Sequence, residues 1–258
     1  IGMILIGYST DFVMLLVSWE LMSIPTYALA AFSKKDPISN EAAIKYFLFG
    51  ALSTAIIVLA MGIVYGMTGT TNIYDSIVVL GNLKAGLIPF GLLAVGLFNA
   101  RFGIKMGLVT FHMWLPDTYA GSPTIIATLL AAGTKKAGFA AAIRVIIIGL
   151  IALNVHWSFV LAIIAVFTMT VGNLGALTQK SIPRMLAYSS LAQAGYILIC
   201  LAVASYSAAV FAASLFHIIN HAVMISAAFI ASAAVIIVIS GYNIEKFKGL
   251  GYRMPVNA

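Results

Sequence analysis

Charged residues are scarce in this sequence, and acidic ones scarcest. Only 8% of the 258 residues are charged, with 7 Asp and Glu against 14 Lys and Arg. Soluble domains carry about 25% charged and about 45–50% apolar residues. This chain is 62% hydrophobic, with a mean hydropathy of +1.09. The composition excludes an ordinary soluble domain and predicts a polytopic membrane protein.

Redox and metal motifs are missing as well. Cys200 is the only cysteine, so no internal disulfide can form, and its apolar neighbours indicate inert burial. The sequence has no GxGxxG fingerprint, no CxxC set and no candidate flavin or iron–sulfur site. We therefore expect no redox centre, bound cofactor or metal in this chain. It also has no cleavable signal peptide, and because it opens on Ile1 rather than Met, we expect a fragment of a longer protein.

Long apolar runs dominate the sequence. A membrane helix needs about 20 mostly apolar residues. Residues 1–8 resemble the end of one span, and complete spans are predicted at 12–32, 41–67, 86–114, 122–153, 157–177, 182–204 and 207–239. Polar or helix-breaking residues predict connections at 68–85 and 115–117. The predicted fold is an all-α polytopic membrane protein of about seven complete spans, forming one transmembrane domain over residues 1–258.

The basic residues collect on one side when the predicted loops alternate. That side holds Lys34, Lys35, Lys45, Lys180, Arg184, Lys246, Lys248 and Arg253. The other side has only Lys84. By the positive-inside rule, loops 33–45, 178–184 and 241–253 are expected to face the cytoplasm of a cell-membrane protein. The net charge of +7 thus indicates orientation and predicts no nucleic-acid partner.

Ionisable residues are concentrated between residues 98 and 144. This stretch contains Arg101, Lys105, His112, Lys135, Lys136 and Arg144. A lysine at the bilayer centre costs roughly 3 kcal/mol on insertion scales, and more in simulations of isolated helices. Such a cluster predicts a functional role, with proton or cation movement as the first candidate.

Glu20 lies roughly 12 Å into its predicted span, at 1.5 Å per residue. A carboxylate at that depth is costly unless it is paired or protonated. We expect it to pair with a nearby lysine and to tune the proton affinity of that lysine. A static structural ion pair is the alternative.

The buried lysines allow more than one interpretation. Lys135 and Lys136 point about 100° apart on a helix, so only one can easily face a given polar axis. Snorkelling to the interface works poorly from mid-span. Lys105 reaches the cytoplasmic surface if its span is unbroken, but Gly103 and Gly107 would permit a break at mid-membrane. A desolvated lysine can accept and release protons.

Two histidines four residues apart, His217 and His221, share one helix face. They lack an acidic or cysteine third ligand, which argues against a metal site. A polar relay or hydrogen bonds between helices are the remaining interpretations. The polar line could extend through Thr168, Thr170, Asn173, Ser189, Ser190 and Gln193. His156, at a loop edge, is interpreted as a solvated interface residue.

Six segments together resemble a known family. They read, in order, SWELMSIPTYAL, EAAIKYFLFGA, FHMWLPDTYAGSPT, GTKKAGFAAAIR, RMLAYSSLAQAGYILI and FHIINHA. Nearly the whole chain is similar to the antiporter-like, proton-translocating membrane subunits of respiratory complex I and its relatives. The N-type subunit is the most similar, in a form like that of the reduced-deazaflavin dehydrogenase of methanogens.

The resemblance implies a fold of about fourteen helices built from two inverted repeats. Residues 1–153 would then be a nearly complete first repeat, and residues 154–258 part of the second. In the family's scheme, Glu20 would be the tuning acid and Lys105 the proton-carrying lysine on a broken helix. The resemblance favours Lys135 over Lys136 as the lysine of the central axis.

The same resemblance makes His217 and His221 the axis histidines, with His112 a candidate relay. Two positions depart from the family pattern. Thr110 stands where Pro usually precedes Phe-His, so the helix break is expected to differ. Ile225 stands where many relatives have Lys, which interrupts the axis toward the second repeat.

The function implied is proton translocation driven by electron transfer in other subunits of a complex I-like oxidoreductase. Quinone or methanophenazine, flavin and iron–sulfur clusters would belong to those partner subunits, and NADH, reduced deazaflavin or ferredoxin could donate electrons. Other membrane-arm subunits and membrane lipid are the expected partners. A subunit of a multi-subunit Na⁺/H⁺ antiporter and a non-translocating structural subunit are the alternatives.

Overall fold

The computed structural model describes residues 1–82, 84–148, 157–203, 207–239 and 241–254. Within these ranges the chain is helical, and the only extended pairings are two isolated bridges. The elements are α1 (Gly2–Tyr8), α2 (Phe12–Ala30), α3 (Pro37–Thr68), α4 (Ile73–Leu80), η1 (Ala85–Leu87), α5 (Ile88–Met106), α6 (Trp114–Gly121), α7 (Thr124–Leu129), η2 (Leu130–Thr134), α8 (Lys135–Ala142), η3 (Ile143–Ile148), α9 (Trp157–Leu177), α10 (Ile182–Ala202), α11 (Ala208–Ile239), η6 (Ile244–Phe247) and α12 (Leu250–Arg253).

Seven stretches of the described residues are long and apolar enough to cross a membrane. They are Phe12–Ala30, Pro37–Thr68, Ala85–Met106, Thr124–Val145, Ser158–Leu177, Ile182–Ala202 and Ala208–Ile239. Their number and order match the spans predicted from the sequence. The all-α membrane fold is therefore confirmed.

Polar caps set where the first helices begin. The Asp11 side chain accepts hydrogen bonds from the amides of Val13 and Met14 at the start of α2. At the start of α3, Asp36 accepts from the Ile38 amide, and Pro37 takes the first helical position, which needs no amide donor.

The two predicted connections lie between spans, but they contain short helices that the sequence analysis does not predict. Residues 68–85 include α4, whose first amides are capped by the Asn72 side chain. Residues 115–117 lie inside α6. The predicted span at 86–114 is also too long, since α5 ends at Met106. The fourth span is described as far as Ile148, so its predicted end at 153 and His156 lie outside the described residues.

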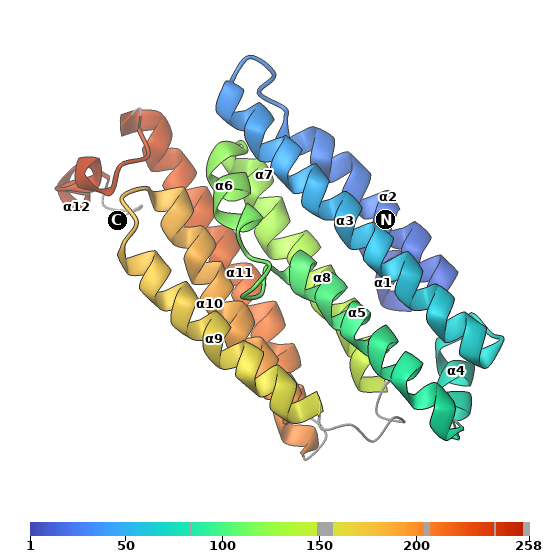
Figure 1. Ribbon diagram of the computed structural model, residues 1–258. Helices are drawn as coiled ribbons and strands as arrows, with labels where there is room; N and C mark the ends of the chain where they lie inside the picture. The colour runs from blue at the N-terminus through green and yellow to red at the C-terminus, as the bar shows by residue number, and fades with distance from the viewer. Residues whose placement is uncertain (83, 149–156, 204–206, 240, 255–258) are drawn as a thin grey trace.

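The long helices run side by side, with α2, α3 and α5 in one group and α9, α10 and α11 in the other (Figure 1). Segments α6, α7 and α8 lie between the two groups (Figure 1). Within the second group α9 and α10 approach closely. A Cβ added at Gly172 of α9 would lie only 2.5 Å from the Ala192 amide nitrogen of α10. Small residues allow such close approach between membrane helices.

The buried apolar side chains form two clusters. The larger contains Trp19, Phe98 and Phe102. The smaller contains Tyr46 and Phe229, with further members from α6, α7 and α10.

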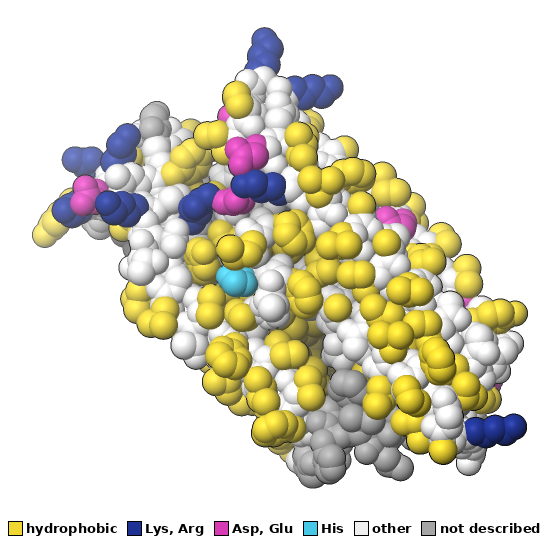
Figure 2. Space-filling model, viewed as in Figure 1, with side chains coloured by type: hydrophobic (Ala, Val, Ile, Leu, Met, Phe, Trp, Pro, Cys, Tyr) yellow, Lys and Arg dark blue, Asp and Glu magenta, His cyan; other side chains and the backbone are white. Residues whose placement is uncertain are grey.

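Lys and Arg side chains gather at the end of the molecule that holds the α2–α3 connection and α12 (Figure 2). This is the end to which the loops at 33–45, 178–184 and 241–253 belong (Figure 1). Lys84 lies at the opposite end, beside η1. The charge asymmetry predicted from the sequence is therefore present in the fold, and assigning the basic end to the cytoplasm stays a prediction.

Candidate functional site

A break in the third span places Lys105 in the protein interior. The helix α5 stops because Gly107 has a φ of +67°, a conformation that glycine adopts without strain. A Cβ at this position would also lie 2.4 Å from the Leu115 Cδ1 atom. The break allowed by the glycines around Lys105 is confirmed, and the unbroken helix to residue 114 is wrong.

The backbone groups released by the break find partners. The indole nitrogen of Trp114 donates to the Ile104 carbonyl at 2.9 Å. The Val109 amide donates to the Thr168 hydroxyl of α9 at 3.1 Å. Non-helical backbone at membrane depth is tolerated when the protein satisfies it in this way.

Thr110 follows the break and has a φ of +87°. Proline cannot adopt this angle, since its ring holds φ near −65°. The local geometry after the break therefore differs from any that a proline at this position would allow.

Lys105 is buried and surrounded by hydroxyl groups. Its Nζ donates to the Tyr46 hydroxyl at 2.8 Å and to the Ser23 Oγ at 3.2 Å. The Tyr46 hydroxyl lies 3.2 Å from the Thr26 Oγ1, so the group continues between α3 and α2. Sequence reasoning missed Tyr46, although a tyrosine buried in an apolar span needs a partner for its hydroxyl.

The cation beside Glu20 is Arg101, and the expectation of a lysine partner is wrong for the described residues. The Arg101 Nη2 lies 4.0 Å from the Glu20 Oε1. The same carboxylate oxygen accepts a hydrogen bond from the Thr54 hydroxyl at 2.7 Å. Arg101 precedes Lys105 by one helical turn and reaches the acid first, leaving Lys105 with neutral hydroxyl partners.

The tandem lysines contact different helices. A π-helical turn, η2, ends directly before Lys135, and such turns are frequent at functional sites. The Lys135 Nζ donates to the Ser190 carbonyl at 2.8 Å and to the Ser190 Oγ at 3.1 Å, both on α10. The Lys136 Nζ forms a hydrogen bond with the His221 Nδ1 on α11. Both lysines are buried, at 1% and 9% exposure, so neither snorkels to an interface.

The two histidines of α11 lie together, as the sequence predicts. Their rings are stacked with centroids 6.3 Å apart. The His217 Nε2 is hydrogen-bonded to the Gln193 Oε1 at 2.8 Å, and the His221 Nε2 is buried without a hydrogen-bond partner. Within the part of the chain that the structure describes, no group of three His, Cys, Asp or Glu side chains could hold a metal ion.

Three singled-out residues stand apart from this cluster. His112 lies in the non-helical stretch before α6, half-buried, and its Nδ1 is buried without a partner. The Arg144 Nη1 donates to the Ser9 carbonyl at 2.9 Å. Ile225 is buried in the smaller apolar cluster, so the polar line of α11 does not continue through it.

Asp117 joins three elements at the basic end of the molecule. Its Oδ2 lies 2.7 Å from the Lys45 Nζ of α3, and its Oδ1 pairs with Arg184 of α10. Lys45 also pairs with Glu41 at 2.6 Å. These half-exposed pairs tie α6, the short helix that follows the break, to both groups of helices.

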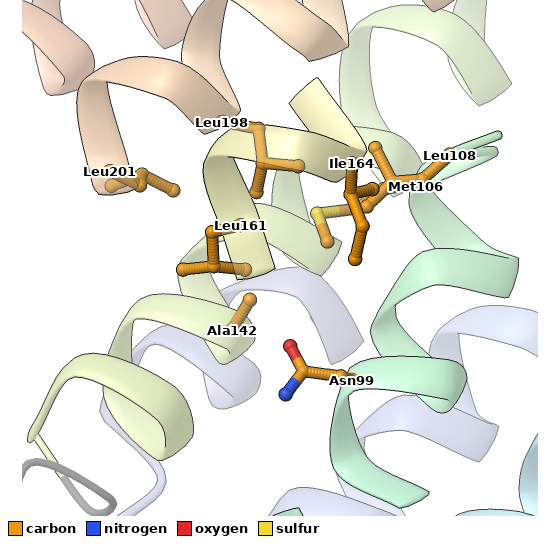
Figure 3. A pocket seen from close by; sticks show the side chains of 8 residues that line it. All are labelled: Asn99, Met106, Leu108, Ala142, Leu161, Ile164, Leu198 and Leu201. Atoms are coloured by element: carbon orange, nitrogen blue, oxygen red, sulfur yellow. The ribbon is translucent and has the colours of Figure 1, made fainter. Parts of the chain in front are cut away.

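An apolar pocket lies beside the helix break. It is lined by Asn99, Met106, Leu108, Ala142, Leu161, Ile164, Leu198 and Leu201 (Figure 3). Asn99 is the polar residue in this lining, and its amide nitrogen donates to the Val95 carbonyl at 3.1 Å. The pocket therefore offers no chain of ionisable groups, unlike the polar cluster around Lys105.

The broken span and the line of buried ionisable side chains define an antiporter-like membrane protein with discontinuous helices. The family model described as "NADH:quinone oxidoreductase/Mrp antiporter, TM" matches residues 9–258. The chain belongs to this family.

Curated relatives agree with this assignment. F(420)H(2) dehydrogenase subunit N of Methanosarcina mazei is 45% identical, covering 100% of this chain and 53% of its own length. NADH-quinone oxidoreductase subunit N of Trichlorobacter lovleyi is 38% identical, covering 100% of this chain and 53% of the relative. The chain thus spans about half the length of these curated relatives.

Solved structures have the same fold. A chain of the archaeal membrane-bound sulfane sulfur reductase superposes with a TM-score of 0.83 at 29% identity, covering 96% of this chain and 50% of that chain. A chain of respiratory complex I from Thermus thermophilus gives 0.77 at 32% identity, with 99% and 54% coverage. A chain of the Mrp complex from Dietzia sp. is similar in fold, with a TM-score of 0.79 at 23% identity.

Proposed function

We propose that this chain is the proton-translocating part of a membrane-arm subunit in a complex I-like oxidoreductase. The observation that carries the proposal is two groups of buried, hydrogen-bonded ionisable side chains: Lys105 with Tyr46 at the helix break of α5, and Lys136 with His221 between α8 and α11. Buried lysines of this kind are costly in a membrane and mark ion or proton pathways.

The proposed route begins at Lys105. Its hydrogen bond leads to Tyr46, which packs in the same apolar cluster as Leu130 and Ala131 of η2, the turn that ends at Thr134. The tandem lysines follow Thr134 directly in sequence. In this proposal Glu20 acts electrostatically on the line, and Lys135 holds a proton within it.

The lateral step is proposed to leave α8 through Lys136. Its ammonium group can pass a proton to the His221 Nδ1 on α11. The stacked His217, hydrogen-bonded to Gln193, lies one helical turn away on the same helix. This reverses the preference for Lys135 as the axis lysine, since in the structure the hydrogen bond to α11 belongs to Lys136. His112 stays a candidate relay on the far side of the break.

The electron-transfer chemistry is assigned to other subunits. Oxidation of NADH, reduced deazaflavin or ferredoxin, with reduction of a quinone or methanophenazine, would need flavin and iron–sulfur centres in partner proteins. Relatives named F(420)H(2) dehydrogenase and NADH-quinone oxidoreductase subunits support this assignment. Multi-pass insertion in the cell membrane, with the basic end in the cytoplasm, belongs to the same proposal.

A Na⁺/H⁺ antiporter subunit is the second candidate, favoured by the family model's description, which covers Mrp antiporters as well. Gentle purification of the complex from native membranes, with mass spectrometry of the comigrating proteins, separates the two. Flavin and iron–sulfur subunits in the particle support the redox-driven pump. A particle made only of small hydrophobic subunits, without a redox protein, would contradict it.

A further inference from the structure

Two side-chain oxygen groups face the position next to Glu20 that Arg101 fills, the Glu20 carboxylate and the Ser53 hydroxyl. The Glu20 carboxylate and the Thr54 hydroxyl are joined at 2.7 Å, and Thr54 also donates to the Gly50 carbonyl at 3.1 Å. The Ser53 hydroxyl lies 3.4 Å from the Arg101 carbonyl. Carboxylate, hydroxyl and carbonyl oxygens are the ligands that hard cations prefer in proteins.

The Arg101 guanidinium fills this position as a cation would. Its Nη1 donates to the Ser53 hydroxyl, and its Nη2 lies 4.0 Å from the Glu20 carboxylate. The group also lies 4.4 Å from the centre of the Trp19 ring and is 1% exposed. Because an arginine stays protonated in proteins, this positive charge is permanent.

Arg101 interacts with its site through its positive charge more than through directed hydrogen bonds. Its Nε and Nη2 are buried without hydrogen-bond partners, so the planar fork that distinguishes arginine from lysine is not used against the acid. A second cation of similar position and charge could therefore replace the guanidinium.

We propose that Arg101 is a tethered cation that occupies the place of Na⁺ beside Glu20 and so excludes Na⁺ from this carboxylate. A sodium ion bound to the Glu20 carboxylate would lie within a few ångströms of the guanidinium, where like charges repel strongly in a low-dielectric interior. The inference rests on the proposed function in one respect, namely that Glu20 acts electrostatically on the proton route.

The acidic residues of the chain strengthen this assignment. Of the 7 acidic residues, Glu20 lies within a span, Glu41 lies in the first turns of α3, and the other five lie outside the spans. Na⁺ would therefore have to compete for the one deep carboxylate, and Arg101 already neutralises it.

The test measures Na⁺ binding without any electron donor, so it does not depend on pumping. The complex is purified with wild-type or substituted chain and unfolded thermally in about 100 mM NaCl or choline chloride. We expect the melting temperatures of the wild type and Arg101→Lys to be equal in the two salts. For Arg101→Gln, we expect Na⁺ to raise Tm by about 2–4 °C over choline, because a bound ion stabilises the folded state.

Two controls locate the effect. The double variant Arg101→Gln/Glu20→Gln should lose the Na⁺ response, and Arg144→Gln, which removes a basic side chain elsewhere, should show none. If Arg101→Gln does not assemble, Arg101→Met keeps the apolar stem over Trp19 and takes its place in the same measurement. Equal melting temperatures of the neutral variant in both salts, or a Na⁺ response in the wild type, would overturn the inference. Absence of pumping would instead contradict the proposed function and leave this result standing.

Discussion

At the scale of single residues, the two adjacent lysines of α8 contact different partners on different helices. Lys135 is held by Ser190 of α10, whereas Lys136 is hydrogen-bonded to His221 of α11. Their side chains point about 100° apart on a helix, which is why neighbours in sequence contact different helices. Each lysine can therefore be removed without removing the contact of the other.

A double-mutant cycle separates the roles of the two lysines. We expect Lys136→Gln and His221→Gln to be non-additive in redox-coupled proton uptake, with a coupling of about 1 kcal/mol or more. Lys135→Gln with His221→Gln should add within about 0.5 kcal/mol, since these residues do not share a hydrogen bond. Equal coupling of His221 to both lysines would contradict a lateral step through Lys136.

The sequence predicts which ionisable residues are buried, but not which residues are their hydrogen-bond or ion-pair partners. Hydropathy alone places Glu20, Lys105 and the tandem lysines inside predicted spans. Because charged residues are rare at that depth, these four stand out as candidate functional residues. Partner choice depends on helix rotation and on the position of breaks, which bring Arg101 to Glu20 and Tyr46 to Lys105. In both pairs the partners are far apart in the sequence, and their spacing does not predict that they are in contact.

Among the elements, the break between α5 and α6 has the greatest consequence for the site. Gly103 and Gly107 mark it in the sequence, yet the short helix α6 that follows was predicted as a loop. Tertiary contacts explain the error: Trp114 satisfies the Ile104 carbonyl at the end of α5, and Thr168 satisfies the Val109 amide before α6. Local sequence signals do not contain such contacts.

Gly107→Ala should damage this break. An alanine with φ near +67° is strained, and its Cβ would lie 2.4 Å from the Leu115 Cδ1 atom. We expect a loss of about 1–3 kcal/mol in stability, measured as a lower Tm or reduced assembly of the complex. Gly96→Ala, on the same helix in open space, is the matched control and should leave Tm unchanged or slightly higher. Equal behaviour of the two variants would argue against a strained break at residue 107.

At the scale of the whole molecule, basic residues are distributed unequally between the two ends of the helix bundle. The basic loops share one end (Figures 1 and 2), and the start of α5, near which Lys84 lies, is at the other (Figure 1). Asp117 adds ion pairs at the basic end between α3, α6 and α10, and exposed pairs of this kind contribute about 0–1 kcal/mol each. Orientation thus follows from the number of basic loop residues more than from any single pair.

Cysteine labelling tests the orientation. In a Cys200→Ser background, Lys35→Cys should react with a membrane-impermeant maleimide only in inside-out vesicles, and Lys84→Cys only in right-side-out vesicles. The reason is that short basic loops stay in the cytoplasm during insertion. The reverse pattern would place the basic end outside and contradict the proposed topology.

One comparison tests most directly whether this chain moves protons during electron transfer. The intact complex, with wild-type chain or Lys105→Ala, is reconstituted in liposomes, and the protons translocated per electron are measured with its own donor and acceptor. We predict that Lys105→Ala abolishes or strongly reduces proton translocation, because the variant lacks the amine that starts the buried line. An unchanged ratio of protons to electrons would contradict the role of Lys105 and, with it, the proposed proton route.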